Sequence, residues 1–256
     1  MLLVVDAGNS HTVFGLYEGS LLRADWRLST HASRTADEWA VEVVGLLSLR
    51  GFQPAQVDAA ILSSVVPPLT GTLAEMIQQF FGIEPLQVGP GIKTGIRILY
   101  ENPLDVGADR IVNSVAAFAK VGGAAVVVDF GTATTFDAIS AKAEYLGGII
   151  VPGLQISADS LFMRTARLPR VEVRKPPRLI GRNTIHSIQS GLYHGYAAMI
   201  NGVLRLLRQE MEGSPRVLAT GGLARVLAAE LEGVDSIEDH LTLEGLRLIH
   251  EKNRDA

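Results

Sequence analysis

The chain has 256 residues, of which 47% are hydrophobic and 20% are charged, values typical of a globular protein of one or two domains. The formal net charge of −4 and the lack of any run of Lys and Arg disfavour a nucleic-acid-binding protein. The absence of cysteine excludes disulfides and thiolate metal sites and fits a cytoplasmic protein. Asp6 interrupts the N-terminal apolar stretch too early for a signal peptide, and no stretch approaches the roughly 20 apolar residues of a membrane helix.

The first half of the chain predicts three leading strands followed by alternating helices and strands. The residues Glu18-Gly19-Ser20 are typical of a hairpin turn, and Thr35 with Glu38 forms a capping box at a helix start. That helix places Trp39, Val43, Leu46 and Leu47 on one face. The other predicted elements are, in chain order, the strands Leu2–Val5, Thr12–Tyr17, Leu21–Leu28 and Ala59–Ser63, the helix Leu69–Phe81 and the strand Leu86–Val88.

The second half repeats this order approximately. Its predicted elements are the strands Ala124–Asp129, Thr134–Ile139 and Tyr145–Val151, the helices Leu154–Arg164 and Thr184–Met211, the strand Arg216–Ala219 and the helix Leu223–Glu232. A repeated mixed sheet with three leading strands indicates the α/β class, with duplicated ribonuclease-H-like half-domains of the actin and sugar-kinase superfold. We therefore expect an N-terminal domain at residues 1–110 and a C-terminal domain at residues 111–256, with a helix ending about Lys120.

One phosphate-loop pattern occurs twice, about half the chain apart. Asp6-Ala7-Gly8-Asn9-Ser10-His11-Thr12 and Asp129-Phe130-Gly131-Thr132-Ala133-Thr134-Thr135 each follow an apolar strand and read Asp-x-Gly-x-x-x-Thr. The glycine lets the backbone approach a ligand, the backbone N–H groups of the turn form an anion-binding concavity, and the carboxylate can hold a cation. A lone copy reads equally well as a strand that ends in a tight turn. Two copies favour two half-domains that hold one nucleotide.

Taken together, the motifs resemble the type III pantothenate kinases, and the resemblance covers nearly the whole chain. The first and second phosphate motifs match, with Ser10 where Thr is also common. The other matching segments are Tyr100-Glu101-Asn102-Pro103 with Gly107-Ala108-Asp109-Arg110, then Gly147-Gly148-Ile149-Ile150-Val151-Pro152-Gly153, and Gly181-Arg182-Asn183-Thr184 with Ser190-Gly191. The resemblance implies ATP-dependent phosphorylation of the primary hydroxyl of pantothenate, which is the first step of coenzyme A synthesis, by a cytoplasmic enzyme.

The resemblance also implies roles for particular residues. ATP would contact Asp6, Ala7, Gly8, Asn9, Ser10, His11, Thr12, Val13 and Thr132. Pantothenate would contact Tyr100, Gly107, Ala108, Asp109, Arg110 and Thr184, with Thr184 reaching it across a subunit interface of a homodimer. A monovalent cation, K⁺ or NH₄⁺, would bind at Asp129, and Mg²⁺ would accompany ATP and be held through water by Asp6.

Asp109 is the expected general base, and Arg110 the expected partner of the substrate carboxylate because its planar fork suits bidentate pairing. The alternative reading of Asp109 is a helix N-cap, which Asp fills well. A helix start and a neighbouring Arg predict that Asp109 stays ionised, with a lowered pKa. Thr184 likewise has an alternative role as the cap of the helix that follows it. Gly191 and Gly195 predict close packing along that helix.

Three other functions compete with this interpretation. The first is another kinase or phosphatase of the same superfold, acting on sugar, acetate or polyphosphate. The second is a non-catalytic relative acting in gene regulation, which the presence of Asp109 and Asp129 disfavours. The third is a two-metal nuclease using Asp6, Asp129 and Asp137, which the acidic net charge disfavours. The expected partners are pantothenate, ATP and a second copy of the chain, without nucleic acid or membrane.

Overall fold

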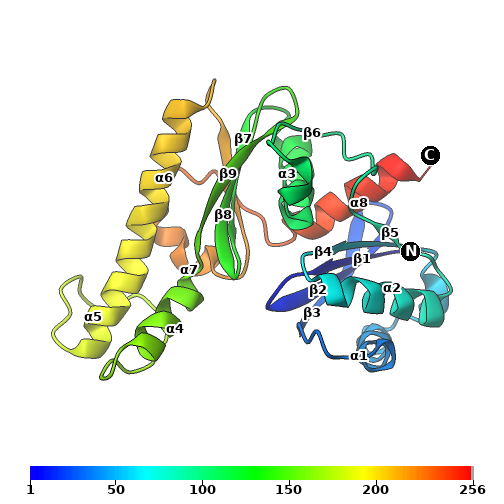
Figure 1. Cartoon of the computed structure of the whole chain (residues 1–256), viewed down its shortest axis with the longest axis horizontal. Helices are drawn as coiled ribbons and strands as arrows, with labels where there is room; N and C mark the ends of the chain where they lie inside the picture. The colour runs from blue at the N-terminus through cyan, green and yellow to red at the C-terminus, as the bar shows by residue number, and fades with distance from the viewer. Residues whose placement is uncertain (255–256) are drawn as a thin grey trace. The chain divides into compact units, whose positions relative to one another are not determined.

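A computed structural model describes residues 1–254, and the chain divides into two compact units. The first unit contains residues 1–116 together with the segment from His240 onward, and the second contains residues 117–239. Each unit holds one mixed sheet with its helices (Figure 1). No helix within residues 1–254 combines the length and apolar character needed to cross a membrane.

The first unit follows the predicted order of strands and helices. Its elements are β1 (Leu2–Ala7), β2 (His11–Glu18), β3 (Leu21–Ser29), α1 (Ala36–Leu49), β4 (Ala59–Ser64), α2 (Pro67–Phe81), β5 (Leu86–Gln87), β6 (Arg97–Ile98), the start of α3 (Ala108–Val121) and α8 (Leu241–Asn253), with short 3₁₀ turns at Pro54–Gln56 and Pro103–Asp105. The sheet order is β3-β2-β1-β4-β5, with β1 antiparallel to β2 and parallel to β4. The predicted strands and helices of this half are confirmed.

The second unit repeats the topology of the first. Its elements are β7 (Ala125–Phe130), β8 (Ala133–Ile139), β9 (Glu144–Pro152), α4 (Leu154–Arg164), α5 (Thr184–Ser190), a π-helical turn (Gly191–Gly195), α6 (Tyr196–Glu210), β10 (Arg216–Thr220), α7 (Ala224–Leu227), a 3₁₀ turn (Ala228–Glu230) and β11 (Ser236–Ile237). Here β7 is antiparallel to β8 and parallel to β10, and five strands of the six-stranded sheet, in the order β9-β8-β7-β10-β11, repeat the arrangement of the first sheet. The predicted duplication is therefore confirmed.

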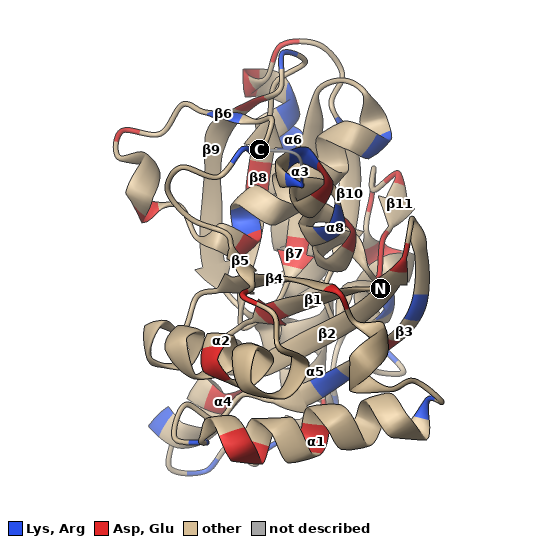
Figure 2. Cartoon of the chain, turned by 90° about the vertical axis from the view of Figure 1, so that its right-hand side faces the viewer, with Lys and Arg blue, Asp and Glu red and all other residues tan. Residues whose placement is uncertain are grey.

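The core of the first unit explains why these residues fold as they do. Alternate residues of β1, Leu3 and Val5, are fully buried on the face that α1 and α2 cover. Burial of such side chains contributes about 1.5–3 kcal/mol each. The predicted capping box is present: the Thr35 side chain accepts the Glu38 N–H, and the Glu38 side chain accepts the Thr35 N–H. Figure 2 marks acidic positions along α1. Two of them, Asp37 and Glu38, lie in the first turn, where the positive end of the helix dipole stabilises negative charge.

The other face of the first sheet is covered by a helix that the sequence pattern did not predict. α8 packs against β1 and β4. A β-carbon at Gly15 would lie 2.9 Å from Val4 Cγ2 and 3.0 Å from Leu243 Cδ1, so the glycine makes room for this helix. The compact units consequently differ from the expected boundaries at residues 110 and 111, because apolar residues of the C-terminal helix pack on the first sheet.

The helical segment after Asn183 differs in one respect from the single helix expected at Thr184–Met211. A π-helical turn separates α5 from α6, at Gly191–Gly195. Within the described chain, a β-carbon at Gly191 or Gly195 would meet nothing within 4 Å. The expected close packing at these glycines is therefore not made inside one chain.

Candidate active site

The first phosphate turn follows β1 and is closed by its own backbone. The Gly8 N–H donates to the His11 carbonyl oxygen at 3.0 Å. Thr30 Oγ donates to the Gly8 carbonyl oxygen at 2.7 Å, and Thr12 Oγ lies 3.0 Å from the same Thr30 hydroxyl. Because Thr30 has one hydroxyl proton, Thr12 is the donor of the second bond. Thr12 is fully buried, so its hydroxyl supports the turn.

The exposed part of the first turn is formed by Asn9, Ser10 and His11. The pKa of His11 lies below its ordinary value, mainly because the imidazole is partly desolvated. The positive charge of the nearby Arg27 lowers this pKa further. The imidazole is therefore neutral at pH 7. An amide, a hydroxyl and a neutral imidazole on an exposed turn can bind phosphate oxygens.

The second phosphate turn follows β7. Asp129 is aligned with Thr135 on β8 and with Thr220 on β10. Gly221 follows β10 with φ +90°, and a β-carbon there would lie 2.6 Å from Asp129 Oδ1 and 2.7 Å from the backbone of Phe130. The Thr220-Gly221 turn is thus packed directly against the carboxylate of Asp129.

Two segments hold the second turn in place. Gly153, at the start of α4, lies against the carbonyl oxygens of Gly131 and Thr132, where a β-carbon would overlap them. The Tyr196 hydroxyl lies 2.8 Å from Thr134 Oγ and 2.9 Å from the Pro152 carbonyl oxygen. Thr134 is buried, whereas Thr132 is exposed and accessible to a ligand.

Asp137 has a structural role. It is fully buried, its Oδ2 accepts the Thr135 hydroxyl at 3.1 Å, and its Oδ1 accepts the Tyr145 hydroxyl at 2.9 Å. A carboxylate whose two oxygens are occupied in this way is poorly suited to a catalytic metal. This geometry disfavours the two-metal nuclease.

Asp109 lies in the first turn of α3, which begins one residue earlier, at Ala108. Its Oδ1 accepts the N–H of Arg110 at 2.8 Å. A β-carbon at Gly107 would lie 2.5 Å from Oδ1, so the carboxylate bends back over the glycine. The N-cap reading of Asp109 is therefore wrong, because the helix has already begun at Ala108.

The expected lowering of the Asp109 pKa is also wrong. Burial raises the pKa of this carboxyl above its ordinary value of 3.8, and the bond from the Arg110 N–H and the Arg110 charge oppose the rise only in part. A raised pKa makes the carboxylate a stronger base. The physical reason for the error is desolvation, which a sequence pattern does not display.

The remaining residues of the predicted pantothenate motif differ in exposure. Tyr100 is 36% exposed and Arg110 is 7% exposed. Between them, Asn102 Oδ1 accepts the Leu104 N–H at 3.3 Å, and Asn102 Nδ2 donates to Asp105 Oδ1 at 2.8 Å. The motif is thus an ordered turn that leads into α3.

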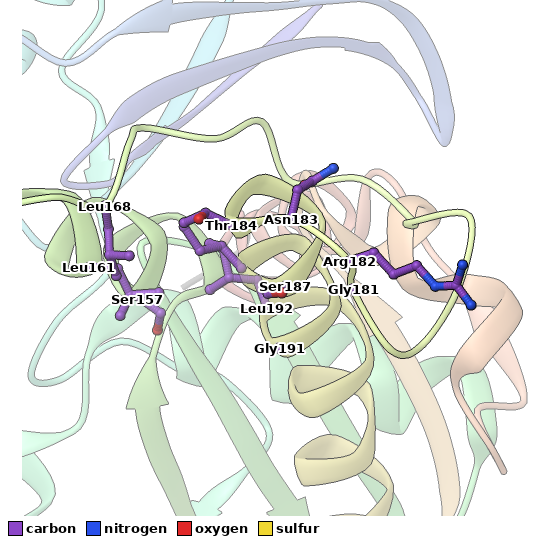
Figure 3. A pocket seen from close by; sticks show the side chains of 11 residues that line it. Ser157, Leu161, Leu168, Gly181, Arg182, Asn183, Thr184, Ser187, Gly191 and Leu192 are labelled. Carbon is purple, nitrogen blue, oxygen red and sulfur yellow. The ribbon is translucent and has the colours of Figure 1, made fainter.

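Thr184 is the first residue of α5, and Asn183 is the cap. Asn183 Oδ1 accepts the His186 N–H at 2.8 Å, so the alternative reading of Thr184 as a cap is wrong. Thr184 is exposed and borders a hollow of about 850 Å³ in the second unit. Figure 3 shows this hollow between side chains of α4 and α5, with Ser157, Leu161 and Ser187 also on its wall.

The donor atoms at Asp129 suit a single hard cation. Within residues 1–254, no three His, Asp or Glu side chains are grouped as ligands for a metal ion. A cation at Asp129 would therefore take one carboxylate together with backbone or hydroxyl oxygens, a low-charge oxygen set.

Sequence reasoning did not identify the groups that hold the second turn. Gly153 belongs to a motif of the sequence analysis and Gly221 does not, and the contacts of Gly153 with Thr132 and of Gly221 with Asp129 depend on tertiary packing. Tyr196 carried no signal, because a tyrosine on a helix is usually a core residue.

The fold is that of the actin and sugar-kinase superfold, with two duplicated α/β halves. The chain aligns with a Sinorhizobium meliloti protein that has a proposed 2-dehydro-3-deoxygalactonokinase activity, with a TM-score of 0.59 and 14% identity. The alignment covers 99% of each chain. It also aligns with an inorganic polyphosphate/ATP-glucomannokinase from Arthrobacter sp. strain KM, with a TM-score of 0.51, 14% identity and 98% of each chain covered. A Campylobacter jejuni protein with a proposed assignment as a Baf family transcriptional activator aligns with a TM-score of 0.60 and 20% identity, over 99% of this chain and 100% of that one.

The sequence relatives define the family. The pattern of the type III pantothenate kinase family matches residues 2–206. The chain is 53% identical to the type III pantothenate kinase of Anaeromyxobacter sp. (strain Fw109-5) over 254 residues, covering 99% of this chain and 100% of that one. It is 49% identical to the protein of the same name from Geobacter sulfurreducens, over 100% of both. The chain belongs to the type III pantothenate kinase family and is a kinase.

Proposed function

We propose that this protein transfers the γ-phosphoryl group of ATP to the primary hydroxyl of pantothenate, giving 4′-phosphopantothenate for coenzyme A synthesis in the cytoplasm. The observation that carries the proposal is the Asp109 carboxylate, held over Gly107 by the N–H of Arg110 in a chain of this family. Its raised pKa suits a group that accepts a proton from an alcohol.

Asp109 accepts the hydroxyl proton as the oxygen attacks the γ-phosphorus and the bond to ADP breaks. In such reactions, positioning and charge stabilisation provide most of the acceleration. Arg110 pairs with the substrate carboxylate, and Tyr100, Gly107, Ala108 and Thr184 complete the pantothenate site. The segment Asp6–Val13 and Thr132 form the ATP site, in which the buried Thr12 supports the turn, and Asp6 would hold the Mg²⁺ that accompanies the nucleotide.

A monovalent cation at Asp129 is the second part of the proposal. Like charges repel at close range, so a carboxylate beside phosphate oxygens needs a cation between them. Among residues 1–254 Asp129 belongs to no group of three His, Asp or Glu side chains that could hold a metal ion, and a single carboxylate suits a singly charged ion, K⁺ or NH₄⁺. The cation would supply positive charge next to the phosphates.

A homodimer is the third part. One face of the helical segment from α5 to α6 carries small, exposed residues, namely Gly191, Gly195 and Ala198 (α6, yellow in Figure 1). Leu206, further along α6, is 59% exposed. Ile185 is 48% exposed on α5. Small residues allow close approach of a second helix, and the apolar ones gain from burial. A partner on this face would bring its Thr184 toward the substrate.

The test is ATP consumption by the purified protein in potassium buffer, with pantothenate, glucose, N-acetylglucosamine, acetate or no acceptor. We expect consumption that depends on pantothenate alone. A faster reaction with a sugar or acetate would assign the chain to another kinase of the superfold. Consumption with no acceptor, or with none of them, would contradict the proposal.

A further inference from the structure

Ser63 carries a buried hydroxyl that the fold does not use. The residue lies near the end of β4 and is 0% exposed, and its Oγ has no hydrogen-bond partner among residues 1–254. The neighbouring Ser64 differs, because its Oγ donates to the Val66 carbonyl oxygen at 3.2 Å and accepts the Val66 N–H at 3.1 Å. A buried hydroxyl without a partner destabilises the fold, and an alanine at this position would remove that cost.

The position of Ser63 connects it to the first phosphate turn. In the parallel pair β1–β4, Ser63 is aligned with Asp6. Aligned residues of neighbouring strands point to the same face, about 4.8 Å apart. Val4 is on the face that α8 covers, so Asp6, two residues further along β1, and Ser63 both point to that face.

The residue that follows β4 lies next to Gly107, over which the Asp109 carboxylate bends. Val65 follows Ser63 by two residues, and its Cγ1 lies 3.6 Å from the place where a β-carbon of Gly107 would stand. The Val65 N–H donates to the Ala7 carbonyl oxygen at 3.0 Å, which fixes the end of β4 to the first turn. Ser63 is therefore paired with Asp6 on the neighbouring strand, and it lies two residues before the Val65 that approaches Gly107.

We propose that Ser63 is a positioning residue of the nucleotide site, whose hydroxyl donates to the Asp6 carboxylate when ATP is bound. A serine can move its Oγ between staggered positions without moving the backbone. The bond would fix the carboxylate that faces the nucleotide and would satisfy the buried hydroxyl at the same time. This inference rests on the proposed nucleotide site at Asp6.

The experiment is calorimetric titration of MgATP into the wild type, Ser63→Ala and Ser64→Ala, without pantothenate. We expect Ser63→Ala to weaken ATP binding about tenfold while its melting temperature stays equal or rises, because only an unpaired hydroxyl is lost from the free protein. Ser64→Ala is the matched control, and it should lower the melting temperature and leave the ATP Kd unchanged. An unchanged ATP Kd in Ser63→Ala would overturn the inference.

Steady-state kinetics separate positioning from general distortion. In Ser63→Ala the KM for ATP should rise with little change in the KM for pantothenate, whereas equal increases in both would overturn the inference. The wild-type titration keeps the two proposals distinct. If the wild type binds MgATP but does not phosphorylate pantothenate, the proposed function fails, and the Kd of Ser63→Ala still decides the role of Ser63. If the wild type binds no MgATP, both proposals fail.

Discussion

The α-carbon of Gly107 lies so close to the Asp109 carboxylate that a β-carbon at position 107 would stand 2.5 Å from Oδ1. Gly107→Ala should therefore displace the carboxylate from its bond with the Arg110 N–H. Because a small misplacement of a catalytic group can cost about 10²-fold in rate, we expect turnover to fall by at least about tenfold. Gly71→Ala is the control, since a β-carbon there meets nothing within 4 Å and should leave turnover unchanged. Steady-state turnover of both variants tests the relationship, and equal turnover would refute it.

Asp109→Asn keeps the shape of the side chain but removes the proton acceptor. General-base assistance is typically worth about 10²–10⁴-fold, so turnover should fall by at least about 10²-fold. Binding of MgATP, measured by calorimetry, should be unaffected. A variant with near-normal turnover would end the general-base assignment while leaving family membership intact.

The raised pKa of Asp109 also predicts how stability depends on pH. The folded state binds this proton more tightly than the unfolded chain, so the contribution of Asp109 to stability is present below its ordinary pKa of 3.8 and is lost as pH rises through the raised folded value. Asp109→Asn should therefore be more stable than the wild type at pH 7, and the difference should shrink below pH 3.8. Urea denaturation at several pH values measures this. If Asp109→Asn were less stable than the wild type at pH 7, the predicted direction of the stability change would be contradicted.

Activity should depend on a monovalent cation. Turnover should rise when K⁺ or NH₄⁺ replaces Na⁺, because the larger ions fit an oxygen site with a single carboxylate. Asp129→Ala should weaken this response and raise the KM for ATP. Equal activity in sodium and potassium buffers would count against the cation site.

The exposed face of α6 should form the dimer contact. Leu206→Glu places a charge on it and should shift the protein toward monomer in light scattering, with loss of activity. Leu49→Glu is a matched control on α1, where Leu49 is 83% exposed and outside the proposed interface. An active wild-type monomer at micromolar concentration would refute the homodimer.

The sequence pattern predicted the repeated order of strands and helices because buried strands and capped helices carry local signals. β1 is apolar throughout, and α1 begins with a capping box at Thr35. α8 was missed because it lacks such a start signal: no side chain caps it at His240. Without this helix the C-terminal segment was assigned to the second domain, although it packs on the first sheet.

The residues of the candidate site could be predicted from sequence motifs, but their burial and packing contacts could not. The spacing of Asp6, Asp109 and Asp129 was readable from the chain. The shift in the pKa of Asp109 was predicted in the wrong direction, because burial raises this pKa and depends on residues distant in sequence. Likewise, the contact of Gly221 with Asp129 and the unpaired hydroxyl of Ser63 arise from strand pairing.

The central claim is tested most directly by identifying the product. Purified protein would be incubated with MgATP and pantothenate in potassium buffer, and the acceptor would be analysed by mass spectrometry and phosphorus NMR. We predict one ADP formed for each pantothenate that gains a single phosphoryl group on its primary hydroxyl, and no such product with Asp109→Asn over the same time. Unmodified pantothenate, or product formed equally fast by Asp109→Asn, would contradict this account.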